Sequence, residues 1–136
     1  MQVVVDANAL FKALIGRGKI LKIFFSNNIE LLAPEFLFEE FEKHKSEIAN
    51  KGKVSVLDLE LALVILKERI KIVPLEEISS HIKNKAKELS PHKKDDPYFE
   101  VALRFEASIL SEEKAFKKQS EIKIFTTEEL LKEFSK

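Results

Sequence analysis

Five short runs of apolar residues recur along the chain and alternate with longer segments of helical periodicity. Each run is rich in Val, Ile and Leu, which is typical of strands buried on both faces of a parallel sheet. Strands that alternate with helices favour right-handed crossovers and a sheet covered on both sides. We therefore expect a three-layer α/β/α sandwich around a five-stranded parallel sheet. The predicted strands are Gln2–Val5, Ile29–Ala33, Ile70–Val73, Ala107–Leu110 and Ile122–Phe125.

The segments between the strands carry apolar residues three and four positions apart, the spacing of a helix with one buried face. Ser55 and Thr126 suit helix caps, and Glu129 completes a capping box with Thr126. Gly16-Arg17-Gly18 separates the first two helices, and His92–Pro97 is expected to be a loop. The predicted helices are Ala7–Ile15, Lys19–Phe25, Pro34–Asn50, Ser55–Arg69, a helix from Ser79 or Ser80 to just before Pro91, Pro97–Glu106 and a terminal helix after Thr126.

Acidic residues lie at or near the carboxyl ends of the predicted strands. Ligands of open parallel α/β sheets bind beyond those ends, so we expect these acids to converge on one edge of the sheet. Asp6 and Asp95 also suit helix caps, a structural role that is compatible with ligand binding. The acids are Asp6 after the first strand, Glu40 in the helix after the second, Asp95 and Asp96 before a helix opened by proline, and Glu112 and Glu113 after the fourth strand.

Several carboxylates in one cleft raise one another's pKa unless a cation compensates their charge. The chain has no cysteine, and His44, His81 and His92 lack metal-ligand spacing, so we expect each histidine at the surface. Oxygen ligands favour a hard ion, Mg²⁺ or Mn²⁺, bound through one or two carboxylates and water. Such an ion activates water and neutralises charge on a phosphate.

Length and charge narrow the classes of function. The 136 residues correspond to about one domain, so residues 1–136 are predicted to form a single domain. Because 23 basic residues balance 23 acidic ones, a nucleic acid would have to meet a local basic patch. Lys93 and Lys94, directly before the acidic loop, are candidates for phosphate contacts. No apolar run approaches a membrane span and no signal-peptide pattern opens the sequence, which favours a cytoplasmic protein without a membrane partner.

Four motifs, in order along the chain, resemble those of the PIN domain family. Val3–Asn8 is a hydrophobic strand followed by Asp-x-Asn, and Ala33–Phe41 places a Glu six positions after a Pro. Asp95 precedes a helix containing Ala-Leu, and Ser111–Phe116 is similar to the family's Ser/Thr-x-Asp-x-x-Phe. The resemblance spans residues 2–126, nearly the whole chain, and the ordered set is far more specific than any one motif.

The resemblance implies both a fold and a site. The fold is a PIN-like sandwich whose five-stranded parallel sheet has the order 3-2-1-4-5, as in the VapC toxins. Glu40 would position or help to deprotonate the attacking water, and Asn8 and Ser111 would lie beside the acids. Three of the acids would hold Mg²⁺ or Mn²⁺, directly or through water: Asp6, Asp95 and Glu113. The implied catalytic quartet is Asp6, Glu40, Asp95 and Glu113.

The sequence therefore predicts a metal-dependent endoribonuclease of the VapC type that hydrolyses phosphodiester bonds of single-stranded or structured RNA. An antitoxin partner and a homodimer are expected with it. The chain departs from the family pattern at Glu113, where Asp is usual. Two site positions stay open between adjacent acids: Asp95 or Asp96, and Glu40 or Glu39. Because of Glu113 and the zero net charge, the alternative is a catalytically weak PIN-like module that binds RNA or protein.

Overall fold

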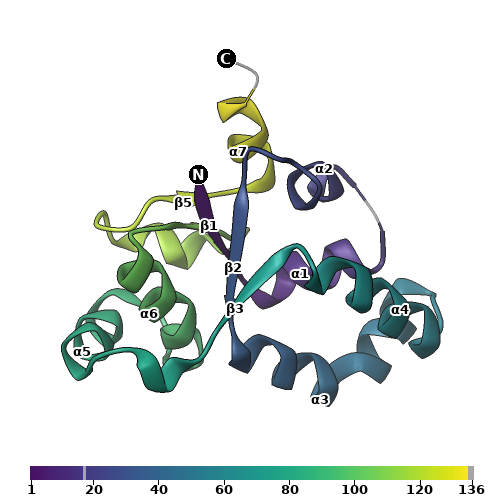
Figure 1. Ribbon diagram of the computed structural model, residues 1–136, viewed down its shortest axis with the longest axis horizontal. Helices are drawn as coiled ribbons and strands as arrows, with labels where there is room; N and C mark the ends of the chain where they lie inside the picture. Colours follow the sequence, from purple (N-terminus) through teal and green to yellow (C-terminus); the bar gives the residue numbers. More distant parts are fainter. Residues whose placement is uncertain (17, 135–136) are drawn as a thin grey trace.

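The computed structural model describes residues 1–16 and 18–134. Its centre is a five-stranded sheet of order β3-β2-β1-β4-β5, with every neighbouring pair parallel (Figure 1). The first strand lies in the middle, where Val4 is paired with Leu32 on one side and Ile109 on the other. The predicted fold class and strand order are both confirmed. The strands are β1 (Gln2–Val5), β2 (Glu30–Pro34), β3 (Ile70–Val73), β4 (Ser108–Leu110) and β5 (Ile124–Phe125).

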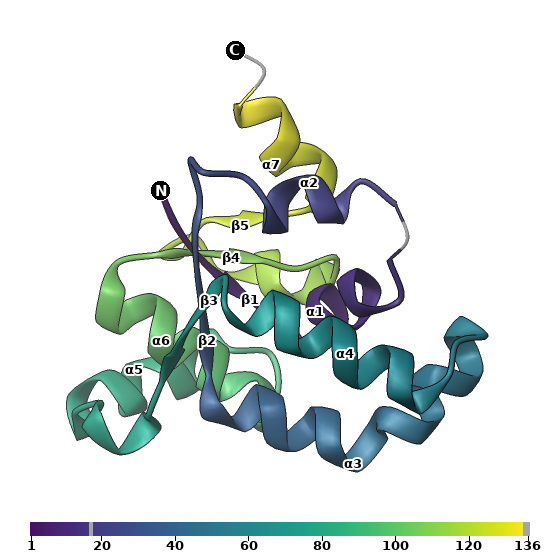
Figure 2. The same ribbon diagram turned by 45° about the vertical axis from the view of Figure 1, so that its right-hand side comes forward.

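Helices cover the sheet on both sides, and Figures 1 and 2 show the three layers. One face carries α6, with α5 packed outside it, and the other carries α1, α3 and α4, with α2 and α7 beside them. The helices are α1 (Ala7–Leu14), α2 (Ile20–Phe24), α3 (Glu35–Gly52), α4 (Val56–Lys67), α5 (Ser80–Leu89), α6 (Asp96–Phe105) and α7 (Thr127–Glu133).

The core explains why these strands read as continuous apolar runs. Val3, Val4 and Val5 of the central strand are completely buried, because neighbouring strands flank them and helices cover both faces. Leu32 and Ile109, their partners in the register, are equally inaccessible to water. The rigid sheet therefore holds its carboxyl edge in a fixed position, and that edge carries the acids singled out above.

Three short 3-10 helices lie in segments where the sequence predicted no helix: η1 (Leu75–Glu77), η2 (Lys93–Asp95) and η3 (Lys114–Lys118). The second of them lies inside the predicted loop His92–Pro97, so that α6 begins at Asp96, one residue before Pro97. The expected break at Gly16-Arg17-Gly18 includes Arg17, which lies outside the described residues. Gly16 and Gly18 both have positive φ, as a break between helices requires.

The third helix runs two residues beyond its predicted end. It continues through Gly52 and ends at Lys53, whose left-handed backbone forms the cap. A Cβ on Gly52 would lie 2.2 Å from Cγ2 of Ile15, so only glycine lets α3 approach the end of α1 this closely. Glycine at this position therefore serves packing between two helices, whereas the sequence alone suggested a stop.

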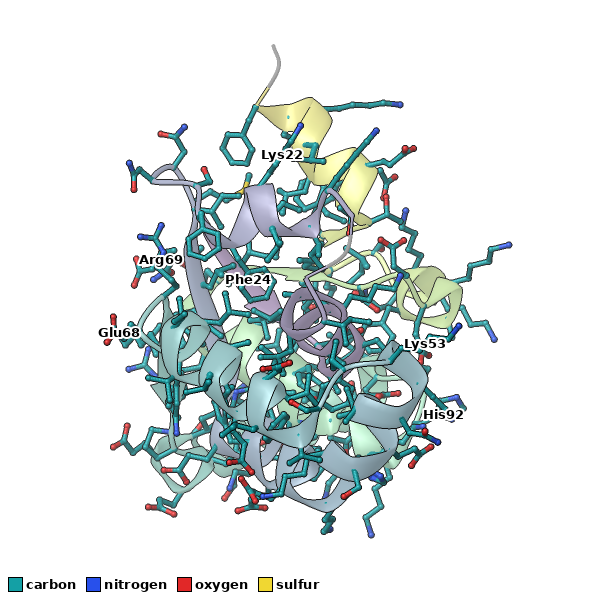
Figure 3. The ribbon with its side chains drawn as sticks, turned by 90° about the vertical axis from the view of Figure 1, so that its right-hand side faces the viewer. Lys22, Phe24, Lys53, Glu68, Arg69 and His92 are labelled. Carbon is teal, nitrogen blue, oxygen red and sulfur yellow. The ribbon has the colours of Figure 1, made fainter. Side chains whose placement is uncertain are left out.

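The end of the fourth helix is fixed to the second. Arg69 donates from Nε to the carbonyl oxygen of Phe24, at 3.2 Å, and from its guanidinium to the carbonyl of Ser26. Figure 3 shows Arg69 beside Phe24 at this junction. Cations at a helix carboxyl end satisfy carbonyls that have no partner within the helix. No helix in the described part of the chain is both long and apolar enough to cross a membrane.

Candidate active site

A cavity of about 230 Å³ opens at the carboxyl edge of the sheet. All four acids of the predicted quartet line it, although they come from four separate parts of the chain. One follows β1, one lies in α3, one ends η2 and one follows β4. The parallel sheet and its crossovers thus bring the four carboxylates together, as expected from the position of the strand ends. They are Asp6, Glu40, Asp95 and Glu113.

Asp6 is the most enclosed of the four. Its Oδ1 accepts a hydrogen bond from the Ala9 amide at 2.9 Å, so the carboxylate also caps α1, and it is hydrogen-bonded with Ser111. Burial raises the pKa of Asp6 to about 6, and the neighbouring Glu113 and Asp95 carboxylates raise it further. The two hydrogen bonds lower it without offsetting the burial. Capping and ligand binding are therefore compatible at this residue, because the Ala9 amide occupies only one of the two carboxylate oxygens.

Asp95 is also buried, and its Oδ2 has no hydrogen-bond partner. It occupies the N-cap position of α6, but its side chain makes no capping hydrogen bond, so the capping role considered for it is wrong. Burial raises the pKa of Asp95, with Glu113 adding to the effect, while Lys94 and His92 lower it. A buried carboxylate oxygen without a partner is costly unless a ligand satisfies it.

The structure distinguishes each acid from its neighbour in the sequence. Asp96 is hydrogen-bonded to the Ser90 hydroxyl and lines a different cavity, on the side of Lys93. Glu39 is exposed and Glu40 is half-buried, and only Glu40 lines the cavity of the quartet. Of each adjacent pair of acids, only one therefore lies at the cavity: Asp95 and Glu40 line it, and Asp96 and Glu39 do not.

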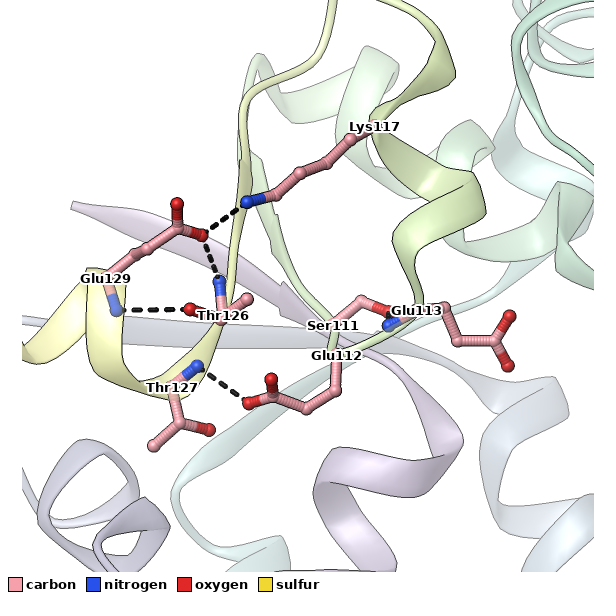
Figure 4. A network of polar contacts seen from close by, with 7 residues as sticks. All are labelled: Ser111, Glu112, Glu113, Lys117, Thr126, Thr127 and Glu129. Atoms are coloured by element: carbon pink, nitrogen blue, oxygen red, sulfur yellow. Dashed lines mark hydrogen bonds and ion pairs between the residues drawn. The ribbon is translucent and has the colours of Figure 1, made fainter.

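The turn after β4 separates two adjacent glutamates. The Ser111 hydroxyl accepts a hydrogen bond from the Glu113 amide at 3.1 Å, which fixes the turn, and Ser111 itself is buried. Glu112 accepts from the Thr127 amide at 2.9 Å, whereas the Glu113 carboxylate points the opposite way (Figure 4). Ser111 therefore supports the site from two directions, through Asp6 and through the backbone of Glu113.

Of the other predicted residues, the structure brings Asn8 and Lys94 to the cavity but not Lys93. Lys93 faces away, into the cavity that Asp96 lines. The 3-10 turn is the reason, because successive residues of such a turn point in directions about 120° apart. One lysine of the predicted pair thus lies near the quartet, and the other does not.

Two polar residues at the cavity were not predicted as site residues. Tyr98 is buried, with its hydroxyl unpaired, and burial together with the Asp6, Glu40 and Asp95 carboxylates raises its pKa. His44, expected at the surface, is half-exposed yet lines the cavity, with Nε2 3.4 Å from an Glu40 carboxylate oxygen. Helical spacing was the available signal, because His44 comes four residues after Glu40 and Tyr98 three after Asp95.

The donor set fits a divalent cation. Among residues 1–16 and 18–134, no three His, Asp or Glu side chains form a ready-made metal site. Mg²⁺ does not need one, because it is commonly bound through one or two carboxylates and several waters. Asp95 has a buried oxygen without a partner, and the pKa values of Asp6 and Asp95 are raised mainly by burial and further by neighbouring carboxylates. A cation between these carboxylates would give the Asp95 oxygen a partner and favour the charged forms of Asp6 and Asp95.

A parallel sheet of this order with acids at its carboxyl edge defines a class of small α/β proteins, and the sequence itself identifies the family. The PIN domain profile matches residues 4–135, so the chain belongs to the PIN domain family. No curated protein matches its sequence.

Solved structures agree with this fold. VapBC2 from Rickettsia felis, bound to a DNA fragment from its promoter, has a TM-score of 0.70 at 14% identity, covering 93% of this chain and 98% of that one. PAE2754 from Pyrobaculum aerophilum has a TM-score of 0.70 at 18% identity, covering 99% and 96%. A toxin-antitoxin complex from Klebsiella pneumoniae has a TM-score of 0.66 at 12% identity, covering 92% and 97%. The TM-scores show a shared fold, and at identities this low the likeness is one of fold alone.

Proposed function

We propose that this protein is a metal-dependent endoribonuclease of the VapC type, acting in the cytoplasm as a single domain over residues 1–136. The observation that carries the proposal is the convergence of four carboxylates, from four distant parts of the chain, on one cavity. Membership of the PIN domain family supports it. So does the likeness in fold to two structures of toxin-antitoxin complexes. The raised pKa of Asp6 adds support, because perturbed acids cluster at functional sites.

Each acid has a distinct role in this proposal. Asp6, Asp95 and Glu113 would hold Mg²⁺ or Mn²⁺, directly or through water, and the ion would supply activated water and offset charge on the phosphate. Glu40 orients the attacking water and accepts its proton. Ser111 keeps Asp6 and the turn of Glu113 in position through the hydrogen bonds described above. Asn8, on the first turn of α1, offers an amide to the substrate or to ordered water at the cavity.

The glutamate at position 113 sets the strength of the site. Glu carries one methylene more than the Asp typical of the family, so its carboxylate reaches further and loses more side-chain entropy when it is fixed. It remains on the cavity all the same. We expect Glu113→Asp to change the cleavage rate more than the affinity for Mn²⁺.

Removal of one carboxylate tests the proposal. Asp6→Asn keeps the size of the side chain and its ability to cap α1, but removes the charge that would hold a cation. We expect cleavage of single-stranded RNA in Mn²⁺ to fall by at least ~100-fold, since metal activation and positioning of water are lost. Asp96→Asn is the matched control, because Asp96 is buried nearby yet lines another cavity. Equal rates for Asp6→Asn and the unchanged protein would refute the assignment.

The second candidate function is a PIN-like module that binds RNA or protein without cutting. Glu113 in place of Asp and the zero net charge favour it. Melting in the presence of Mn²⁺ separates the two candidates. For the nuclease, an excess of ion about 100-fold over Kd stabilises the fold by ~2.7 kcal/mol, which raises the melting temperature by ~9 °C. The shift should vanish in Asp6→Asn and persist in His81→Ala, and no shift in the unchanged protein favours the inert module.

An antitoxin partner also belongs to the proposal, and α4 supplies the surface for it. The helix is apolar nearly all round, and a helix of that kind is normally covered. Its inner face packs into the core, but four large aliphatic side chains point outward, each 57–65% exposed. We assign this face to an apolar helix of the antitoxin, in line with the complexes of similar fold. The four residues are Leu57, Leu61, Val64 and Ile65.

Leu61→Glu tests this surface against the product of a short neighbouring reading frame co-expressed with the chain. We expect the complex to be lost while RNA cleavage by the free protein persists, because α4 lies outside the quartet's cavity. The homodimer stays a prediction, and light scattering of the isolated chain tests it. A dimer that Leu61→Glu dissociates would give the α4 face to a second copy and contradict the assignment to the antitoxin.

A further inference from the structure

A second and larger cavity, of about 620 Å³, adjoins the one that holds the quartet. Four residues line both cavities, so the two form one continuous groove that leads away from the carboxylates. Its walls are α1 and α3, and it ends where Ile15 meets Gly52. A volume in this range suits a ligand of nucleotide size. The shared residues are Asn8, Phe11, His44 and Lys94.

The charge changes sign along this groove. The quartet's end carries four acids, whereas the far end carries Lys12 and Lys51, and Lys94 lies where the two cavities join. Two acids also line the far end, but both are engaged: Glu47 pairs with Lys51 at 3.2 Å, and Glu112 accepts from the backbone of α7. No ion pair within 4 Å is found for Lys12 or Lys94 in the described part of the chain. These two lysines are therefore the cations available to an anionic ligand.

The wall between the charges is apolar. Phe11 on α1, Ile15 just after α1 and Ile48 on α3 are partly buried, with the remainder of each side chain turned to the groove. An aromatic ring in a groove that also carries lysines is an arrangement that binds single-stranded nucleic acid, since a base stacks on the ring while phosphates meet the cations. A paired base cannot offer its face in this way.

We propose that this second cavity binds one unpaired nucleotide of the substrate, next to the phosphate held at the quartet. Its base lies against Phe11, and its phosphates contact Lys12 and Lys94. The inference rests on the proposed function and makes it more specific, because it requires an unpaired nucleotide beside the cleaved bond. A fully paired RNA would then bind weakly, whatever its sequence.

Binding of RNA to the Asp6→Asn protein in EDTA tests the proposal without any cleavage. Fluorescence anisotropy with a short single-stranded RNA, at low and rising salt, is compared with a duplex of the same sequence. We expect Lys12→Ala to weaken binding and to reduce the slope of log Kd against log salt by about 0.7, the value for one phosphate contact on a single strand. Lys22→Ala, an exposed lysine on α2, is the matched control and should leave the slope unchanged.

Phe11→Leu gives an independent measure, since it keeps an apolar side chain in the groove but removes the stacking surface. We expect the affinity to fall at least ~5-fold, with an unchanged melting temperature as evidence of folding. No RNA binding at low salt, equal slopes for Lys12→Ala and Lys22→Ala, or equal affinity for duplex and single strand would overturn the proposal. So would an acidic peptide that occupies the groove while RNA does not.

These outcomes are distinguishable from failure of the proposed function. If the unchanged protein cuts no RNA but binding depends on Lys12 and Phe11, the nucleotide site stands and the nuclease assignment falls. If the protein cuts RNA and Lys12→Ala binds it as tightly as before, the nuclease stands and the nucleotide site falls.

Discussion

Two carboxylates of this protein perform the same local task in opposite surroundings. Asp6 caps α1 at the edge of the quartet's cavity, and Glu129 belongs to the capping box of α7. Glu129 accepts from Lys117 at 2.6 Å and from the Thr126 amide at 2.9 Å, and these partners lower its pKa to about 2 (Figure 4). Asp6, buried among other acids, has its pKa raised to about 6.

The opposite pKa shifts of Glu129 and Asp6 distinguish a carboxylate that stabilises the fold from one whose charge the fold disfavours. The contacts around Glu129 all favour its charged form, so this network stabilises the end of the chain's fold. The surroundings of Asp6 oppose its charge, although a protein selected for stability alone would place a neutral residue there. Conflicts between local surroundings and global fold are expected at functional sites. The helix cap explains why Asp6 is tolerated, and the proposed cation site would explain why its charge is kept.

The largest expected effect sharpens this comparison through activity. Glu40→Gln removes the proposed proton acceptor and should reduce RNA cleavage in Mn²⁺ by ~10²–10⁴-fold. Glu39→Gln changes the exposed neighbour on the same helix and should leave the rate within about twofold, as should Glu129→Gln at the other carboxylate network. A rate loss in Glu39→Gln equal to that in Glu40→Gln would mean that α3 faces the substrate differently.

A second effect concerns the pH dependence of metal-free stability. The folded protein holds the Asp6 proton up to about pH 6, whereas the unfolded chain releases it near pH 3.8. In this interval the folded state binds more protons, so the free energy of unfolding decreases as the pH rises, by at most about 3 kcal/mol. Asp6→Asn should remove this loss and be more stable than the unchanged protein at neutral pH in EDTA. Urea denaturation across this range measures it, and a variant less stable at neutral pH would show that capping dominates.

The smallest effect has the opposite sign at Glu129. Its pKa is lowered from 4.5 to about 2, so its contribution to stability is complete above pH 4.5 and disappears as the pH falls through about 2. Glu129→Gln should cost about 1 kcal/mol at neutral pH, in the range of a lost helix cap, and nothing near pH 2. Glu128→Gln is the control, because Glu128 is more exposed and lies 3.9 Å from Lys19. Equal losses in both variants would make the capping box unimportant.

Much of the fold and the outline of the site could be predicted from the sequence. Buried strands such as Val3–Val5 are apolar throughout, so their pattern is visible without a structure, and acids that follow them must lie at the carboxyl edge. The resemblance to PIN domains supplied the strand order, which hydrophobic pattern alone does not determine.

The direction of individual side chains could not be predicted in the same way. A 3-10 turn ending at Asp95 turns Lys93 and Lys94 apart, and nothing in the residues announces that turn instead of a loop. The unpaired hydroxyl of Tyr98 depends on which atoms fail to reach it, and that is known only once the chain is packed. His44 reached the cavity because α3 presents Glu40 and the residue one turn later on the same face.

The assembly of the quartet from positions 6, 40, 95 and 113 has a consequence for the newly made chain. Its first acid leaves the ribosome early and its last only after β4, so the four carboxylates cannot meet while the chain is still short. Contacts between segments this far apart in sequence also form late and slowly in folding. Any activity that requires all four acids is therefore delayed until synthesis has passed Glu113.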